Sequence, residues 1–272
     1  PLILHAVMSG SSRYLRRWQS GMPPAQFGCA YLNFTASHDG IGMRPAEGIL
    51  PPEEQARMID TIKDIGGLVS MRALPDGGEA PYEINTTFYE ATSRTFDGLD
   101  SLHFERFVCS QTIVMSLEGI PAFYIHSMLA TPNDHMQVAR RGMNRAINRH
   151  RWDYPTLNAL LDDPATVQSQ VLGALSDRLG IRARQPAFHP NATQFTMQLD
   201  RVFGVWRQSL DRHQSIFALH NVSNETVEVS FATMNLIDDE DWVDLLSGDP
   251  VDTAQETLTL APYQCCWITN RS

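Results

Sequence analysis

The sequence predicts an α/β protein in two parts: an α/β region followed by a small antiparallel β domain. Helix-like and strand-like segments alternate up to about residue 186, as in an α/β barrel or an open parallel sheet. From about residue 187, short alternating polar and apolar stretches are separated by turn-forming residues, which is typical of antiparallel strands. A hydrophobic content of 43 % in 272 residues is ordinary for a globular protein with a core.

The first part begins with helical patterns and a strand. Residues 2–20 predict two helices, because a Ser-Gly break interrupts the pattern and the following serines can cap a second helix. Residues 29–36, "CAYLNFTA", predict a strand buried on both faces. Two prolines and two acids predict a helix start in residues 51–54, and Gly66-Gly67 end that helix. Residues 68–95 are expected to form a hairpin-like insertion.

The rest of the first part continues the alternation. Residues 100–117 predict an amphipathic helix, and "GIPAFYI" after it predicts a short strand. A polar loop is expected over 130–150, with helices near 155–162 and 165–180. About 186 residues are too few for a complete eight-fold α/β barrel, which usually needs roughly 250.

Charge and composition exclude several classes of partner. A net charge of −10 argues against nucleic acid and against an anionic membrane surface as partners. No apolar run is long enough for a membrane span, and no histidine spacing is typical of a metal site. The four cysteines lie in apolar runs, which predicts buried free thiols and a reducing compartment. The chain opens with Pro1 inside a helix-like pattern, which predicts a fragment or a processed chain.

The pair His38-Asp39 ends the predicted strand "YLNFTA". Catalytic groups of α/β barrels lie at the C-terminal ends of strands, so a carboxylate at this place is suited to chemistry. The alternative is that Asp39 caps the next helix or ties down the loop by accepting from backbone N–H groups. Gly40 and Gly42 would let the backbone turn sharply and approach a ligand closely.

The segment "FTASHDGIG" resembles the fourth conserved region of the α-amylase superfamily (glycoside hydrolase family 13). "HDGIG" with the later "RPAEGIL" is similar to the sucrose phosphorylase subfamily, and closest to its glucosylglycerate and sucrose 6-phosphate phosphorylases. "PYEINTTFYEA", "GIPAFYI", "AINRH" and "WVDLLSG" resemble further segments in the right order. The resemblance covers essentially the whole chain. It implies the C-terminal portion of a TIM-type (β/α)8 barrel over residues 1–186, with an insertion about 68–95, and an antiparallel β domain over 187–272.

The resemblance also implies a reaction. The family performs retaining glucosyl transfer with an Asp nucleophile, in a Gly-x-Arg-x-Asp pattern, and a Glu acid/base; both lie before the His-Asp region. No such pattern precedes Asp39. The prediction is a cytoplasmic phosphorylase fragment, inactive alone, whose full-length protein takes an α-glucoside and inorganic phosphate, needs no cofactor and yields α-glucose 1-phosphate. The alternatives are a hydrolase or transglucosylase of the superfamily, or an inactive fragment. The oligomeric state is left open.

The glucosyl subsite is implied to include three residues of this chain. Asp39 would be the transition-state stabiliser, and His38 would hydrogen-bond a glucosyl hydroxyl. Arg149, in "INRH", would grip a hydroxyl or orient a carboxylate; the alternative is a surface arginine on a charged loop. Asn148 and His150 are expected to shape the loop.

Two further residues are implied at the acceptor side. Tyr82 would border the acceptor subsite; alternatively it packs at the barrel rim. The neighbouring Glu83 would repel phosphate unless it is paired. Arg44 would bind an acceptor that carries a carboxylate or phosphate; the alternative is an ion pair with Glu47 that only stiffens the loop.

Overall fold

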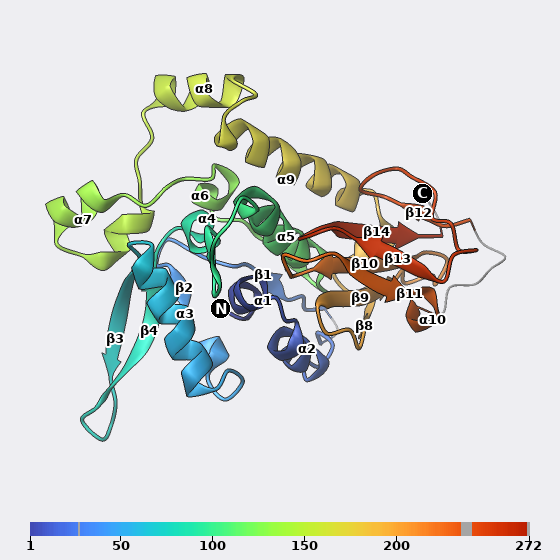
Figure 1. Cartoon of the computed structure of the whole chain (residues 1–272), viewed down its shortest axis with the longest axis horizontal. Helices are drawn as coiled ribbons and strands as arrows, with labels where there is room; N and C mark the ends of the chain where they lie inside the picture. The colour runs from blue at the N-terminus through green and yellow to red at the C-terminus, as the bar shows by residue number, and fades with distance from the viewer. Residues whose placement is uncertain (27, 235–240, 271–272) are drawn as a thin grey trace. The chain divides into compact units, whose positions relative to one another are not determined.

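The computed structural model of the chain describes residues 1–26, 28–234 and 241–270 (Figure 1). The chain divides into two compact units. Unit 1 comprises Pro1–Ser9, Phe34–Phe107 and Phe123–Leu175; unit 2 comprises Gly10–Asn33, Val108–Ala122 and Ser176–Ser272. Each unit is therefore made of three segments that are separated in the sequence. The domain boundary at residues 186 and 187 stays a prediction.

Unit 1 is mainly helical. Its helices are α1 (Leu2–Ser9), α3 (Pro52–Asp64), α4 (Phe88–Ala91), α6 (Ile125–Met128), α7 (His135–Arg141) and α8 (Tyr154–Asp162), with 3₁₀ turns η1 (Arg44–Ala46) and η2 (Asn144–Asn148). Helices α5 (His103–Ser116) and α9 (Val167–Ala183) each supply residues to both units. As predicted, α3 starts at a proline with acids in its first turn, and Gly66 follows it at a φ of +81°.

Unit 1 also holds a three-stranded antiparallel sheet in the order β2 (Ile41–Gly42), β4 (Glu79–Asn85), β3 (Leu68–Ala73). The β3–β4 pair is the hairpin that the sequence predicts in this segment (Figure 1). Its register shifts between Ser70 and Met71, so that Tyr82 is the extra residue of a bulge. A short second hairpin joins β5 (Arg94–Thr95) to β6 (Gly98–Leu99).

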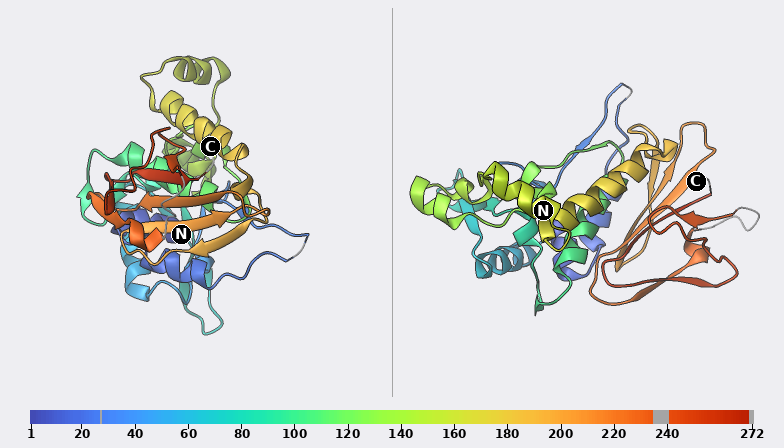
Figure 2. Two further views of the ribbon diagram at one scale, coloured as in Figure 1. Left: turned by 90° about the vertical axis from the view of Figure 1, so that its right-hand side faces the viewer. Right: turned by 90° about the horizontal axis from the view of Figure 1, so that it is seen from above.

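Unit 2 is built on antiparallel strands, as the sequence predicts. One sheet has the order β12 (Val243–Asp244), β14 (Cys265–Thr269), β10 (Ser215–Asn221), β9 (Val202–Gln208), β8 (Thr193–Thr196). A second pairs β11 (Val227–Ser230) with β13 (Thr257–Leu260). Figure 2 shows these strands lying side by side in both views. The unit also includes α2 (Arg13–Ser20), η3 (Pro186–Phe188) and α10 (Phe231–Met234).

The two faces of β10 are buried in different ways. Phe217 and Leu219 belong to an apolar cluster with residues of β9, β11, β13 and β14. His220 points to the opposite face of β10 and is fully buried. Its Nε2 lies 2.9 Å from Ser116 Oγ, and its Nδ1 lies 2.9 Å from the Phe203 carbonyl oxygen. Trp267 Nε1 donates to the same hydroxyl at 3.0 Å. Burial lowers the pKa of His220 to about 4.

A parallel pair of short strands in unit 2 differs from the sequence prediction. Only Leu32–Asn33 of the segment 29–36 forms a strand, β1, which pairs in parallel with β7 (Ile120–Pro121). Leu32 is 61 % exposed and Phe34 is 55 % exposed, so the prediction of a strand buried on both faces is wrong for this chain. The physical reason is that β1 has β7 as its one strand neighbour among the described residues.

A glycine makes this pairing possible. The Ile120 amide donates to the Tyr31 carbonyl oxygen at 2.8 Å. Gly119 lies against that carbonyl with a φ of +111°, and a Cβ there would lie 2.4 Å from the Tyr31 oxygen. The Gly that precedes the predicted strand "IPAFYI" is therefore needed for the close approach of two backbones.

Two smaller expectations also need correction. The predicted loop over 130–150 contains α7 and η2, because Asp134 caps α7 by accepting from the Gln137 amide at 2.9 Å and Gly142 ends it in the left-handed region. Cys29 is exposed rather than buried, since it lies outside any helix or strand. In the described part of the chain, no helix is both long enough and apolar enough to cross a lipid bilayer.

Candidate active site

His38 and Asp39 form the tip of a tight turn in unit 1. Ser37 and Gly40 exchange backbone hydrogen bonds at 3.1 Å on either side of the pair. Gly40 has a φ of +118°, and a Cβ there would lie 2.4 Å from the Ile84 carbonyl oxygen of β4. The expected close approach at this glycine is therefore made to a strand of the protein. A Cβ at Gly42 would have no described atom within 4 Å, so this second glycine is under no such constraint.

The Asp39 carboxylate is held through one of its two oxygens. Oδ1 accepts from Arg149 Nη2 at 2.9 Å and lies 3.0 Å from Arg145 Nη1 and 3.3 Å from His38 Nε2. No donor contacts Oδ2 within the described ranges, and the side chain is 35 % exposed. The partners are side chains, so Asp39 is not the helix cap or loop tie that was the alternative. Oδ2 can accept a hydrogen bond from a ligand hydroxyl.

Arg149 is anchored to the same turn. Its Nε donates to the His38 carbonyl oxygen at 2.7 Å, while its Nη2 holds Asp39. It is therefore a partner of the His-Asp pair and not a free arginine of a charged loop. The neighbouring Asn148 also binds this turn, since its Nδ2 donates to the Ser37 carbonyl oxygen at 2.9 Å. The backbone carbonyl of Asn148 accepts from the Tyr124 hydroxyl at 2.9 Å.

His150 also acts on the loop, as expected. Its Nδ1 lies 2.6 Å from Asp134 Oδ2 at the start of α7. Burial of Asp134 acts to raise its pKa, but the hydrogen bonds from His150 and from the Gln137 amide outweigh this and lower the pKa overall. The pair thus fixes the segment that leads from α7 to Arg149.

Arg145, which the sequence did not single out, and Glu83, which it marked only as a charge in need of a partner, complete the cluster. Arg145, on η2, makes a bidentate pair with Glu83 of β4, with Nε–Oε2 at 2.9 Å and Nη2–Oε1 at 2.6 Å. Glu83 is 6 % exposed, and this hydrogen-bonded pairing is the main cause that raises the pKa of Arg145. The sequence held one signal: a glutamate flanked by apolar residues on a strand requires a cationic partner when it is buried.

Asn85 ties β4 to the turn. Its side chain is fully buried, and its Nδ2 donates to the Asp39 carbonyl oxygen at 2.9 Å. Its Oδ1 accepts from Ser70 Oγ of β3 at 2.6 Å. The backbone of Asp39 is thus fixed by the same strand that carries Glu83.

Tyr82 and Arg44 lie at the margin of the cluster. Tyr82, at the bulge of β4, is 37 % exposed. The Arg44 side chain is exposed on η1 and has no ion pair with any described residue. Glu47 pairs instead with Arg72 at 2.8 Å, so the alternative Arg44–Glu47 pair does not form. Both assignments as substrate-binding residues stay predictions.

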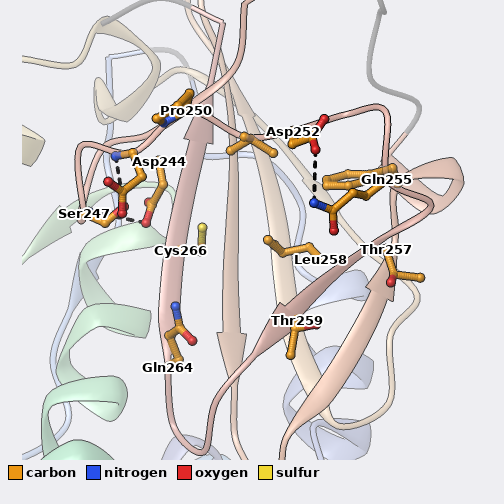
Figure 3. Close-up of a pocket in the computed structure, with 13 residues that line it drawn as sticks. Asp244, Ser247, Pro250, Asp252, Gln255, Thr257, Leu258, Thr259, Gln264 and Cys266 are labelled. Carbon is orange, nitrogen blue, oxygen red and sulfur yellow. Dashed lines mark hydrogen bonds between the residues drawn. The ribbon is translucent and has the colours of Figure 1, made fainter.

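A separate pocket lies wholly in unit 2, with a volume of about 330 Å³ (Figure 3). It is lined mainly by residues of β13, β14 and the segment 244–255. Asp244 accepts from the backbone amide of Trp267 on β14 at 2.7 Å and from that of Leu246 in the following turn at 3.1 Å, so its carboxylate is held by the backbone. Among the residues described, no group of His, Cys, Asp and Glu side chains is arranged to hold a metal ion.

The chain is similar in sequence to known phosphorylases. No protein-family model matches it. It is 36 % identical over 269 residues to a glucosylglycerate phosphorylase of Allomeiothermus silvanus, covering 98 % of this chain and 45 % of that protein. It is 33 % identical over 270 residues to a glucosylglycerate phosphorylase of Escherichia coli, covering 98 % of this chain and 46 % of that protein.

A solved structure supports the fold. The crystal structure of a sucrose 6F-phosphate phosphorylase from Thermoanaerobacter thermosaccharolyticum matches with a TM-score of 0.67 at 18 % identity, covering 96 % of this chain and 46 % of that one. This likeness concerns the mixed α/β fold. The chain spans about half the length of the curated relatives it matches. Because nearly its whole length is homologous to glucosylglycerate phosphorylases, the chain belongs to the sucrose phosphorylase subfamily of the α-amylase superfamily.

Proposed function

We propose that this chain is part of a retaining glucosyl phosphorylase, which cleaves an α-glucoside with inorganic phosphate and releases α-glucose 1-phosphate. The observation that carries the proposal is the Asp39 carboxylate, fixed through Oδ1 by two arginines with Oδ2 left to accept from a ligand. This arrangement suits a transition state with oxocarbenium character, because a fixed anion beside the glucosyl ring stabilises the positive charge that develops there.

Each site residue has a place in this proposal. Asp39 stabilises the transition state through contacts with glucosyl hydroxyls, and His38, 67 % exposed at its side chain, hydrogen-bonds a hydroxyl in the same subsite. Arg149 orients Asp39 by donating a hydrogen bond from Nη2 to Oδ1. Tyr82 borders the space in which the acceptor or phosphate binds.

The covalent chemistry would be completed by residues outside this chain. An Asp nucleophile forms the glucosyl-enzyme bond while a Glu protonates the departing oxygen. Phosphate then attacks the anomeric carbon, gives its proton to that Glu and displaces the Asp carboxylate as the glucosyl-enzyme bond breaks. In this proposal β1 and β7 correspond to neighbouring strands of a TIM-type (β/α)8 barrel, which their parallel pairing supports. Residues 187–272 correspond to the small antiparallel β domain that follows the barrel.

Two observations favour glycerate as the acceptor that is released from the glucoside. The relatives named glucosylglycerate phosphorylases are 33–36 % identical to this chain, against 27 % for a sucrose phosphorylase of Agrobacterium vitis. Glycerate carries a carboxylate, and the exposed guanidinium of Arg44 can bind a carboxylate in a bidentate manner. We place the reaction in the cytoplasm, where phosphate is plentiful and free thiols such as Cys109 persist.

The test is product analysis with the complete protein that contains this chain. We expect α-glucose 1-phosphate from 2-O-α-glucosylglycerate and phosphate, measured by a phosphoglucomutase-coupled assay. Sucrose or sucrose 6-phosphate as the better substrate would overturn the glycerate assignment alone. Release of free glucose without glucose 1-phosphate would indicate a hydrolase, and the absence of both products would overturn the enzymatic proposal.

A further inference from the structure

A bridging arginine connects Asp39 to a second carboxylate of unit 1. The Nε and Nη2 atoms of Arg145 face the two oxygens of Glu83, and its remaining Nη1 faces Asp39 Oδ1 at 3.0 Å. A guanidinium presents its donors in a rigid planar fork, so the direction of Nη1 is set by whatever holds the other edge.

Glu83 is the group that holds that edge. It is 6 % exposed, and β4 carries it into the cluster together with Asn85, which binds the Asp39 carbonyl oxygen. Glu83 Oε2 also lies 3.5 Å from Asn85 Nδ2. One strand therefore fixes Asp39 twice, through its backbone by an amide and through its side chain by way of Arg145.

The charges in this cluster balance. Asp39 and Glu83 supply two negative charges, and Arg145 and Arg149 supply two positive charges. Without the Glu83 carboxylate, an uncompensated guanidinium would face the place where positive charge develops on the sugar. That charge would oppose the transition state, while it would attract a phosphate anion.

We propose that Glu83 is a positioning residue, which acts through Arg145 to orient Asp39 and to balance the charge of the glucosyl subsite. This inference deepens the proposed function and rests on it. It also answers the concern that a carboxylate next to Tyr82 repels phosphate: the Glu83 charge is taken up by Arg145, and phosphate meets a neutral cluster.

The first test needs no turnover and uses the complete protein that contains this chain. The Nε–H of Arg145, which donates to Glu83, is followed by ¹⁵N NMR and assigned by its loss in Arg145→Lys. We expect a slowly exchanging signal in the wild type that persists in Asp39→Asn and disappears in Glu83→Gln. Persistence of the signal in Glu83→Gln, or its loss in Asp39→Asn, would overturn the geometry of the bridge.

The second test uses steady-state kinetics of the complete protein. In Glu83→Gln we expect kcat to fall roughly tenfold, as for a misplaced catalytic group, and the KM for phosphate to fall as well. In the double variant Glu83→Gln/Arg145→Gln, the KM for phosphate should return toward the wild-type value while kcat stays low. The surface variant Asp64→Asn removes a carboxylate paired with Arg94 and is the matched control.

The outcomes separate the two proposals. A wild type without glucose 1-phosphate overturns the proposed function, while the NMR result still decides the bridge. An active wild type in which Glu83→Gln leaves both kcat and the KM for phosphate unchanged overturns the positioning role. A rise in the KM for phosphate in Glu83→Gln would also overturn it, because loss of a negative charge cannot weaken anion binding by the route proposed.

Discussion

Replacing His220 with Gln should change how the stability of this protein depends on pH. His220 is fully buried on β10, where its two nitrogens contact Ser116 Oγ and the Phe203 carbonyl oxygen. Its pKa falls from 6.5 to about 4 in the folded state, because burial disfavours the charged ring. Between pH 6.5 and about 4, His220 is therefore protonated in the unfolded chain but stays neutral in the folded chain.

The sign and size follow from this difference. The contribution of the neutral ring to stability is complete above pH 6.5 and is lost as the pH falls toward 4. One pKa unit corresponds to about 1.4 kcal/mol, so the loss over this range is on the order of 3 kcal/mol. The wild type should lose that much stability through His220 alone, and His220→Gln should not.

Urea unfolding followed by tryptophan fluorescence at several pH values between 7.5 and 4.5 measures the effect. His220→Gln should be the less stable protein at pH 7.5, because it disturbs the contact with Ser116, and its deficit should shrink steadily toward acid pH. His213→Gln, which replaces an exposed histidine of the same unit, is the control. A deficit that is constant across the pH range would refute the reasoning.

Three further predictions concern other parts of the chain. Gly40→Ala should lower the melting temperature strongly, because its Cβ would lie 2.4 Å from a carbonyl oxygen of β4, whereas Gly42→Ala should be tolerated in the same thermal scan. In the complete protein, Arg44→Ala should raise the KM for glycerate in the synthesis direction by about tenfold or more, with sucrose formation from fructose as the comparison; an unchanged acceptor preference would contradict the assignment. Maleimide should label the exposed Cys29 rapidly and the buried Cys109, whose pKa is raised chiefly by its contact with Cys265 and by burial, only on unfolding; mass spectrometry of the native chain distinguishes the two.

The helices and the antiparallel strands could be predicted because their signals are local. The proline and acids at the start of α3, the turn glycines and the alternation along β8 and β11 depend on residues a few positions apart. The burial of β1 could not be predicted in the same way. An apolar run shows that a strand can be buried, but its actual exposure depends on which strands lie beside it.

Some residues of the candidate site could also be predicted from local sequence, while others could not. His38, Asp39 and Arg149 could be predicted as site residues because they lie in segments that resemble the family, "FTASHDGIG" and "AINRH". The pairing of Glu83 with Arg145 joins residues 62 positions apart; the sequence indicated that Glu83 needs a partner but not which residue supplies it. Only the fold brings them to Asp39, since β4 runs beside the turn and η2 follows α7.

The contact between Gly40 and the Ile84 carbonyl has a consequence for how such enzymes can diversify. The turn that carries Asp39 fits directly against the backbone of the hairpin that carries Tyr82, with no room for one added methyl group. A hairpin taken from another protein must therefore arrive with the turn that fits it. A recombination crossover between residues 40 and 84 would separate two backbones that are shaped to each other.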